Sequence, residues 1–291
     1  MFEGAHTALV TPFRNNRLDE AAYTRLIEDQ IAHGITGIVP VGTTGESPTL
    51  DNAEHHRVIE LAVEIAAKRC LVIAGTGSNS TTEAISLTQE AEKAGADAAL
   101  LVAPYYNKPS QEGLFRHFQA IAAATKLPLV LYSIPGRSGI EIGVETVRRL
   151  AAACPNIVAI KEAGGSADRV SQLRQALPAA FEILSGDDAL TLPFMAAGAV
   201  GVISVASNLI PGEVAALAKA ALAGDLAQAR ALHEKWYPLF RDLFVETNPV
   251  PVKTALAMQG RIARELRLPL CEMSEANTAK LRATLAALKL I

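Results

Sequence analysis

Short apolar or β-branched runs alternate with longer segments of helical periodicity from the N-terminus to about residue 205. This repeated alternation predicts parallel strands joined by crossover helices. The predicted strands cover residues 8–11, 37–41, 71–75, 98–103, 129–132, 157–161, 181–185 and 200–205. The predicted helices between them cover residues 20–33, 53–68, 82–94, 112–125, 144–153, 169–176 and 189–197.

About eight βα units over roughly 220 residues favour an α/β fold with a closed (β/α)8 TIM barrel. The main alternative is a Rossmann-like sheet that binds a dinucleotide. The nearest counterpart of its Gly-rich fingerprint is Gly75-Thr76-Gly77-Ser78-Asn79-Ser80, which lacks the third glycine. The pattern therefore predicts the barrel.

The alternation of strand and helix patterns ends at Pro211. After it the sequence predicts only helices, at residues 213–223, 226–245, 252–259 and 274–288. The first of these helices is expected to close the barrel, and the others to form a small helical domain. We therefore predict a catalytic barrel over residues 1–224 and a C-terminal helical domain over residues 225–291. Apolar faces on these helices are typical of packing surfaces.

Composition narrows the classes of function. The chain has 27 Lys and Arg against 30 Asp and Glu, and it has no basic block that would neutralise a nucleic-acid backbone. The N-terminus lacks a signal peptide pattern and no apolar run is long enough to span a membrane, so we expect a cytoplasmic protein. The three cysteines, Cys70, Cys154 and Cys271, are far apart and predict neither a disulfide nor a zinc site.

Lys161 ends the predicted strand 157–161, at the barrel face where such folds carry their active sites. Period-two alternation puts Lys161 on the same face as Ile157 and Ala159. If that face is directed inward, burial lowers the pKa of the amine and frees it to attack a carbonyl and form an imine. A lysine at a strand end with its ammonium group in water is an equally good interpretation of position alone.

Three further features follow predicted strands. The loop Gly42-Thr43-Thr44-Gly45-Glu46-Ser47 offers hydroxyls and backbone N–H groups that suit a carboxylate, although a capped turn is the better explanation of this loop taken alone. Tyr132 can relay protons or be a core aromatic. Arg137 can bind a carboxylate through two hydrogen bonds or be a solvated loop residue. Their joint position on one face of the barrel favours function.

The chain resembles the dihydrodipicolinate synthases, Schiff-base aldolases of the N-acetylneuraminate lyase superfamily. The similar motifs occur in the same order along the whole chain, with Ser133 and Ser138 where Asn and Thr are common. They are Gly42 to Ser47, Pro104-Tyr105-Tyr106-Asn107-Lys108-Pro109, Tyr132 to Gly139, Lys161-Glu162-Ala163, Ser185-Gly186-Asp187-Asp188 and Asn248-Pro249-Val250-Pro251-Val252-Lys253.

The resemblance implies that pyruvate forms a Schiff base on Lys161 and condenses with L-aspartate 4-semialdehyde to give 4-hydroxy-tetrahydrodipicolinate, the first step of the diaminopimelate and lysine pathway. Thr43 and Thr44 would hold the pyruvate carboxylate. Tyr132, Thr44 and Tyr106 would form a proton relay, with Tyr106 reaching in from a neighbouring subunit.

The resemblance also implies a homotetramer built as a dimer of dimers. Arg137 would bind the carboxylate of the semialdehyde, and the backbone of Gly186 and Ile203 would line the pocket. No metal or organic cofactor is expected, because the imine itself accepts the electrons.

Two other functions stay open. One is another pyruvate-dependent aldolase of the superfamily, such as N-acetylneuraminate lyase or a keto-sugar-acid aldolase. The adjacent threonines Thr43 and Thr44 and the position of Arg137 favour the synthase. The other is a non-catalytic binding member of the fold, against which Lys161, Tyr132 and Tyr106 argue.

A regulatory site is also expected, in which L-lysine binds as a feedback inhibitor at a dimer interface. The positions that resemble its lining are Ser47, Pro48, Asn52, His55, Asn79, Glu83 and Tyr105. Glu83 can pair with a cationic amino group, whereas Pro48 and Asn52 differ from the residues common in lysine-sensitive enzymes. An alternative is that Asn79 and Glu83 simply stabilise the start of a helix.

Overall fold

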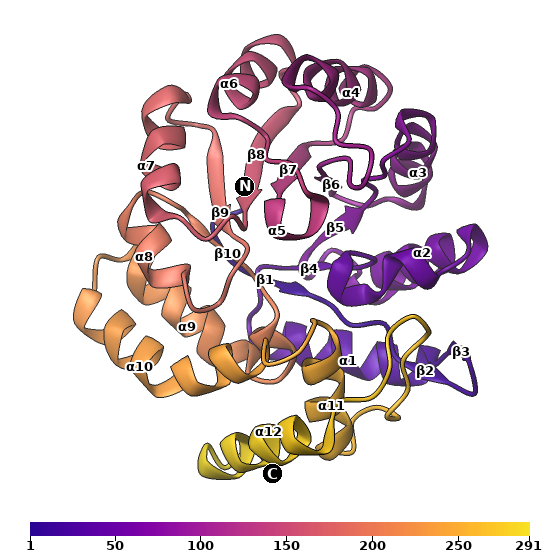
Figure 1. Cartoon of the computed structure of the whole chain (residues 1–291), viewed down its shortest axis with the longest axis vertical. Helices are drawn as coiled ribbons and strands as arrows, with labels where there is room; N and C mark the ends of the chain where they lie inside the picture. The colour runs from indigo at the N-terminus through magenta and orange to yellow at the C-terminus, as the bar shows by residue number, and fades with distance from the viewer.

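The computed structural model describes residues 1–291, and its centre is a closed barrel of eight parallel strands (Figure 1). The order around the barrel is β1, β10, β9, β8, β7, β6, β5 and β4, and β4 closes on β1. These strands are β1 (Gly4–Ala8), β4 (Gly37–Val39), β5 (Leu71–Gly75), β6 (Ala98–Val102), β7 (Leu129–Ser133), β8 (Ile157–Glu162), β9 (Glu182–Ser185) and β10 (Gly201–Ser204). The prediction of a (β/α)8 barrel is confirmed.

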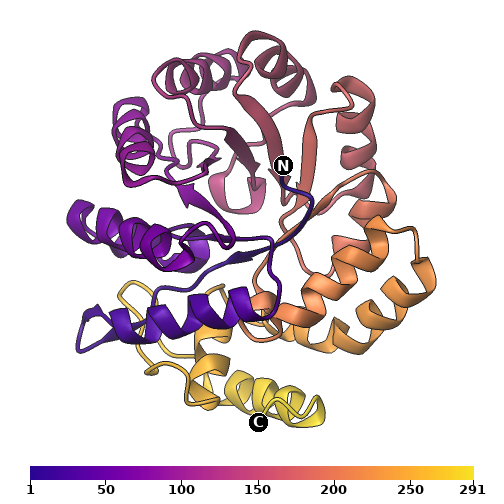
Figure 2. The same cartoon turned by 180° about the vertical axis from the view of Figure 1, so that it is seen from behind.

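A ring of helices surrounds the strands, as both views of the molecule show (Figures 1 and 2). Side chains at the helix starts fix several of them: Asp51 and Glu54 form a capping box at α2, and Ser80, Ser110 and Ser166 cap α3, α4 and α7. The ring consists of α1 (Glu20–Ala32), α2 (Asn52–Ala66), α3 (Thr81–Ala94), α4 (Gln111–Ala123), α6 (Val144–Ala153), α7 (Ala167–Ala176), α8 (Thr191–Ala196) and α9 (Pro211–Leu222).

The predicted first strand was wrong, since β1 covers Gly4–Ala8 and not residues 8–11. The apolar run after Ala8 suggested a strand, but the strand contains two buried polar residues. His6 hydrogen-bonds the carbonyl of Phe2, and Thr7 donates to Gln30 in α1. Polar groups paired in this way can be buried, and apolar periodicity does not detect them.

Several short elements were not predicted. A hairpin of β2 (Phe13–Arg14) and β3 (Arg17–Leu18) turns at Asn15 and Asn16, which both have positive φ. Short helices follow β4, β7 and β10, at the ends of the strands that open onto one face. They are η1 (Thr43–Gly45), η2 (Ser47–Thr49), α5 (Pro135–Ser138) and η3 (Ala206–Asn208).

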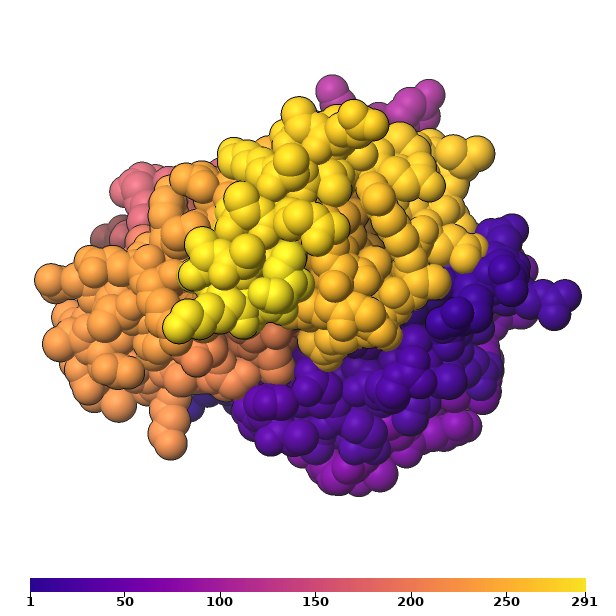
Figure 3. Space-filling model, turned by 90° about the horizontal axis from the view of Figure 1, so that it is seen from below, coloured from indigo at the N-terminus to yellow at the C-terminus, as the bar shows by residue number.

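Three helices follow the barrel: α10 (Leu226–Asp242), α11 (Val250–Met258) and α12 (Glu275–Ala287). Seen from below, they lie across one side of the molecule next to the N-terminal segment (Figure 3). Trp236 of α10 and Leu281 of α12 belong to the same apolar core cluster as Val39 of the barrel. The boundary between residues 224 and 225 stays a prediction. None of the helices combines the length and hydropathy needed to cross a bilayer.

Candidate active site

A cavity opens at the C-terminal ends of the barrel strands, where Lys161 from β8 and Tyr132 from β7 stand on paired positions of neighbouring strands. The other walls come from the η1 loop, α5 and the segment between α10 and α11. Its polar lining includes Thr43, Thr44, Lys161, Tyr132, Arg137 and Asn248. The structure therefore brings together residues from strand ends and loops that are far apart in the sequence.

Lys161 is buried in this cavity, with 6% of its surface exposed. Its Nζ atom lies 4.3 Å from the centre of the Tyr132 ring. Burial lowers the pKa of Lys161 from 10.5 to about 8, and the negative charge of Asp188 only partly opposes this effect. A usable fraction of the side chain is therefore the neutral, nucleophilic amine near neutral pH.

Tyr132 is buried beside the lysine and keeps its phenolic proton. Burial raises the pKa of Tyr132 to about 12, against the opposing effects of the Arg137 charge and of the Thr43 side chain. A protonated phenol next to a reactive amine can donate a proton and take it back.

The adjacent threonines of η1 have different partners. Thr43 is the threonine whose side chain acts on the pKa of Tyr132, whereas the Thr44 hydroxyl accepts a hydrogen bond of 2.9 Å from the Asn248 amide. Successive residues of a 3-10 helix are rotated by about 120°, so adjacent side chains face different directions. This geometry differs from the expected relay, in which Thr44 was the hydroxyl next to Tyr132.

Arg137 lies at the entrance of the cavity in α5, directly after β7. One guanidinium nitrogen donates to the Asn248 carbonyl at 2.9 Å. The remaining donors of its side chain are available for an anion. Arg137 therefore has both the charge and the position to bind a carboxylate.

The opposite wall is formed after β9 and β10. Gly186 lines it, and a Cβ atom at this position would lie 3.0 Å from Cε of Lys161 and 2.6 Å from Cβ of Ala163. Ile203 is buried inside β10, and the lining residue from that strand end is Val205. The absence of a side chain at Gly186 keeps the lysine free to move toward a substrate.

Asp188 is a buried carboxylate for which the sequence suggested no role. It accepts hydrogen bonds from the Ser204 hydroxyl and from the backbone N–H groups of Val205 and Ala206, at 2.5–3.0 Å. Burial raises its pKa to about 6. Asp188 therefore holds the turn after β10 and adds a negative charge near the amine.

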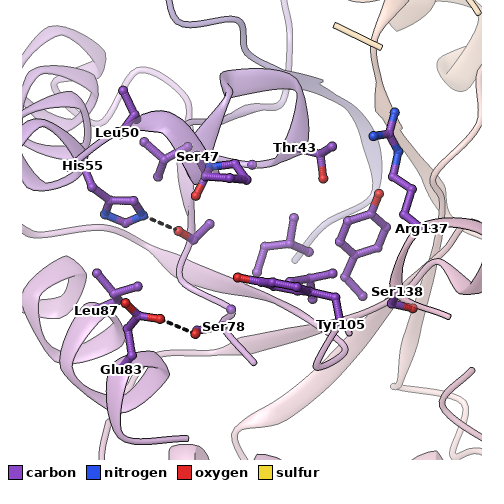
Figure 4. Close-up of a pocket in the computed structure, with 18 of the residues that line it drawn as sticks. Thr43, Ser47, Leu50, His55, Ser78, Glu83, Leu87, Tyr105, Arg137 and Ser138 are labelled. Carbon is purple, nitrogen blue, oxygen red and sulfur yellow. Dashed lines mark hydrogen bonds between the residues drawn. The ribbon is translucent and has the colours of Figure 1, made fainter. Parts of the chain in front are cut away.

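A second cavity of about 420 Å³ adjoins the first and shares Thr43, Tyr132 and Arg137 with it. Figure 4 shows His55 and Glu83 on one side, Thr43 and Arg137 on the other, and Tyr105 between them. Of the seven positions expected for an effector, six line this cavity: Ser47, Pro48, Asn52, His55, Glu83 and Tyr105.

Several groups of the second cavity already have partners inside the chain. Glu83 accepts from the Ser78 hydroxyl, and Nε2 of His55 lies 3.0 Å from the Gly75 carbonyl. Asn79 lies outside the lining and donates to the Tyr105 carbonyl. Burial lowers the pKa of His55, so its ring is neutral at neutral pH. A ligand would gain its contacts partly by replacing these internal ones.

Tyr106 lines neither cavity of the single chain. Its side chain is 88% exposed, and its backbone has a φ of 72°. A non-glycine residue with positive φ is uncommon and is often found at functional positions. No group of three or more His, Cys, Asp or Glu side chains could hold a metal ion.

Comparison with known proteins agrees with this geometry. The family model described as the dihydrodipicolinate synthetase family matches residues 1–288. The 4-hydroxy-tetrahydrodipicolinate synthase of Thermodesulfovibrio yellowstonii is 54% identical over the whole length of both chains. The structure of the synthase from Methylacidiphilum fumariolicum SolV has a TM-score of 0.99 and 61% identity, with 99% of this chain and 96% of that chain covered.

A more distant solved structure has a ligand. It is the dihydrodipicolinate synthase of Cyanidioschyzon merolae with lysine bound, with a TM-score of 0.97 and 42% identity over 100% of this chain and 99% of that one. Matches of this length and identity, on a barrel that places a buried lysine at the end of β8, show that the chain belongs to the dihydrodipicolinate synthetase family.

Proposed function

We propose that the chain condenses pyruvate with L-aspartate 4-semialdehyde and forms 4-hydroxy-tetrahydrodipicolinate, the reaction for which its relatives are named. The observation that carries this proposal is Lys161, a buried amine with a lowered pKa at the mouth of the barrel. The reaction begins the diaminopimelate and lysine pathway.

Lys161 attacks the keto carbon of pyruvate, and loss of water leaves an imine. The pyruvyl methyl group then loses a proton, and the resulting enamine carbon bonds to the aldehyde carbon, whose oxygen becomes a hydroxyl. The amino group of the second substrate attacks the imine carbon, which closes the ring and releases Lys161. Every step is acid–base or nucleophilic chemistry, in which the imine accepts the electrons.

Tyr132 and Thr43 move the protons in these steps. The effect of the Thr43 side chain on the pKa of Tyr132 supports Thr43 as the relay hydroxyl, in place of Thr44, which was expected there. Thr44 keeps the other expected role and binds the pyruvate carboxylate together with the backbone N–H groups of the loop. The pyruvate carboxylate then lies next to Lys161, at the inner end of the cavity.

Arg137 binds the carboxylate of the semialdehyde. Its position at the entrance puts it further along the substrate path than Lys161. A guanidinium group that already donates to one carbonyl is held in place and can still form two hydrogen bonds to a carboxylate. The backbone of Gly186 completes the wall on the opposite side.

Tyr106 completes the relay from a neighbouring subunit of a homotetramer. Its high exposure and its absence from the cavity of its own chain support this assignment. Inactive Tyr106→Phe subunits mixed with inactive Lys161→Ala subunits should then regain part of the activity. Mixed oligomers without activity would contradict a shared site.

L-Lysine acts as an effector in the second cavity. The lysine-bound relative and the six expected lining positions support this role. Glu83 is the anion available for a cationic amino group, and the neutral His55 can accept from the side-chain ammonium.

Reductive trapping tests the function directly. The protein is incubated with pyruvate and borohydride, and the peptides are analysed by mass spectrometry. We expect one stable adduct, on Lys161, and none in Lys161→Ala. An unmodified Lys161 in the wild type would contradict the mechanism, and absence of turnover in an assay with the semialdehyde and the downstream reductase would contradict the substrate.

A further inference from the structure

Asn248 is a polar residue of the cavity without a role in the chemistry above. It lies between α10 and α11, more than 80 residues from Lys161 in the sequence, and only 6% of its surface is exposed. It lines the same cavity as Lys161. A buried amide in this position calls for an explanation, since burial of polar groups is unfavourable unless they are hydrogen-bonded.

The Asn248 side chain makes one hydrogen bond, from Nδ2 to Oγ1 of Thr44 at 2.9 Å. An amide nitrogen only donates, so the Thr44 oxygen is the acceptor in this contact. The hydroxyl proton of Thr44 must therefore point elsewhere. It is free to donate to an anion in the cavity.

The backbone of Asn248 contacts the second anion-binding group. Its carbonyl accepts from Nη2 of Arg137 at 2.9 Å. The same residue therefore contacts both Thr44, at the inner carboxylate site, and Arg137, at the outer one. The distance between the two carboxylate-binding groups depends on where Asn248 is held.

The Asn248 side chain also has an unused acceptor. Its Oδ1 atom is buried and has no hydrogen-bond partner in the chain. The contact with Thr44 is therefore the only hydrogen bond that holds the Asn248 side chain.

Lys253 holds the segment that carries Asn248 against the same loop. The Lys253 ammonium is buried, pairs with the Glu46 carboxylate and donates to the Thr11 carbonyl at 2.9 Å. Residues 248–253 therefore contact the η1 loop at two points, Thr44 and Glu46. Two contacts on one short segment fix the amide relative to the threonine.

We infer that Asn248 is a positioning residue that orients the Thr44 hydroxyl as a donor to the pyruvate carboxylate and sets its spacing from Arg137. This inference rests on the proposed function, because it takes pyruvate as the inner ligand. Asn248 acts through Thr44 and Arg137 and takes no part in proton transfer.

The isosteric substitution Asn248→Asp tests the polarity of the hydrogen bond. A carboxylate only accepts, so it would take the Thr44 proton and also repel the substrate carboxylate. We expect the pyruvate KM to rise about fivefold to tenfold in Asn248→Ala, the range of one lost neutral hydrogen bond, and further in Asn248→Asp. The semialdehyde KM should change less, because the contact with Arg137 is made by the backbone.

Gln259→Ala is the matched control. Gln259 directly follows α11, its amide also donates one hydrogen bond, to the Leu290 carbonyl at 3.1 Å, and its oxygen is also buried without a partner. It does not line the cavity. Pyruvate kinetics should stay at the wild-type level in this variant, even if its thermal stability falls.

A double-mutant cycle with Thr44→Val separates positioning from a general effect on folding. If Asn248 acts through Thr44, Asn248→Ala should add little to the pyruvate KM of Thr44→Val. The inference would be overturned if Asn248→Ala and Asn248→Asp kept the wild-type pyruvate KM. It would also be overturned if the effects of Asn248→Ala and Thr44→Val on the pyruvate KM multiplied in the double variant. Borohydride trapping on Lys161 of the wild type decides the proposed function separately, because it does not depend on Asn248.

Discussion

Replacement of Lys161 by Met should abolish turnover and make the protein more stable. The wild-type folded state holds this amine in a buried site, where its charged form is unfavourable, as the lowering of its pKa to about 8 shows. Methionine has a similar length, fits irregular space and carries no charge. The substitution removes the catalyst together with the cost of burying it.

The size and pH dependence of the gain follow from the two pKa values. Lys161 takes up a proton below about pH 8 in the folded state and below 10.5 in the unfolded state. Between these values the unfolded state binds more protons, so wild-type stability rises with pH. Below pH 8 the buried amine lowers the stability of the wild type by its full amount, about 3 kcal/mol. This loss of stability disappears above the pKa of the unfolded state. We therefore expect Lys161→Met to be more stable by about 3 kcal/mol at pH 6.5, and by less than about 1 kcal/mol at pH 10.

Urea unfolding at equal protein concentration, followed by the fluorescence of the single tryptophan, Trp236, measures this difference. Lys253→Met is the control, because Lys253 is equally buried but pairs with Glu46. Removal of one partner of a buried ion pair costs about 3–5 kcal/mol, so the same substitution should have the opposite sign there. Equal or lower stability of Lys161→Met at pH 6.5, or a gain that does not change with pH, would refute the reasoning.

Three further predictions concern activity. The initial rate of trapping on Lys161 should rise about tenfold per pH unit up to about pH 8 and then level off, because the neutral amine reacts; a rise that continues to pH 10 would contradict the lowered pKa. Arg137→Ala should raise the semialdehyde KM by the equivalent of about 1.5–3 kcal/mol, and impaired pyruvate binding instead would reverse the assignment. Calorimetry should detect L-lysine binding that Glu83→Ala abolishes with turnover intact; no heat at millimolar lysine and unchanged initial rates would remove the effector.

The barrel could be predicted because its strands are short, apolar and regularly spaced, and each is followed by a helix. The first strand was misplaced because its polar residues, His6 and Thr7, are buried with internal partners. The position of Lys161 followed from alternation along one strand, whereas its lowered pKa depends on burial by other strands. Periodicity describes one element at a time and contains no information about such contacts.

Sequence motifs did not predict the contacts that Thr43 and Asn248 make. The sequence presents two adjacent threonines, and only the rotation of the 3-10 helix decides which of them contacts Tyr132. Asn248 belonged to a recognised motif, but its partner Thr44 is 204 residues away. The signal that could have identified Asn248 is an amide at the start of a proline-rich turn in an otherwise helical region.

Three residues of the loop after β4 make three different contacts, although they are nearly adjacent in the sequence. Thr43 contacts Tyr132, Thr44 contacts Asn248, and Glu46 pairs with Lys253. Glu46 has the left-handed backbone, with a φ of 54°, that is uncommon for a residue with a side chain. The buried ion pair fixes this conformation, because a Glu46 turned away from Lys253 would leave a buried charge unpaired. The two hydroxyls are therefore aligned by a contact that lies outside the cavity and involves neither substrate.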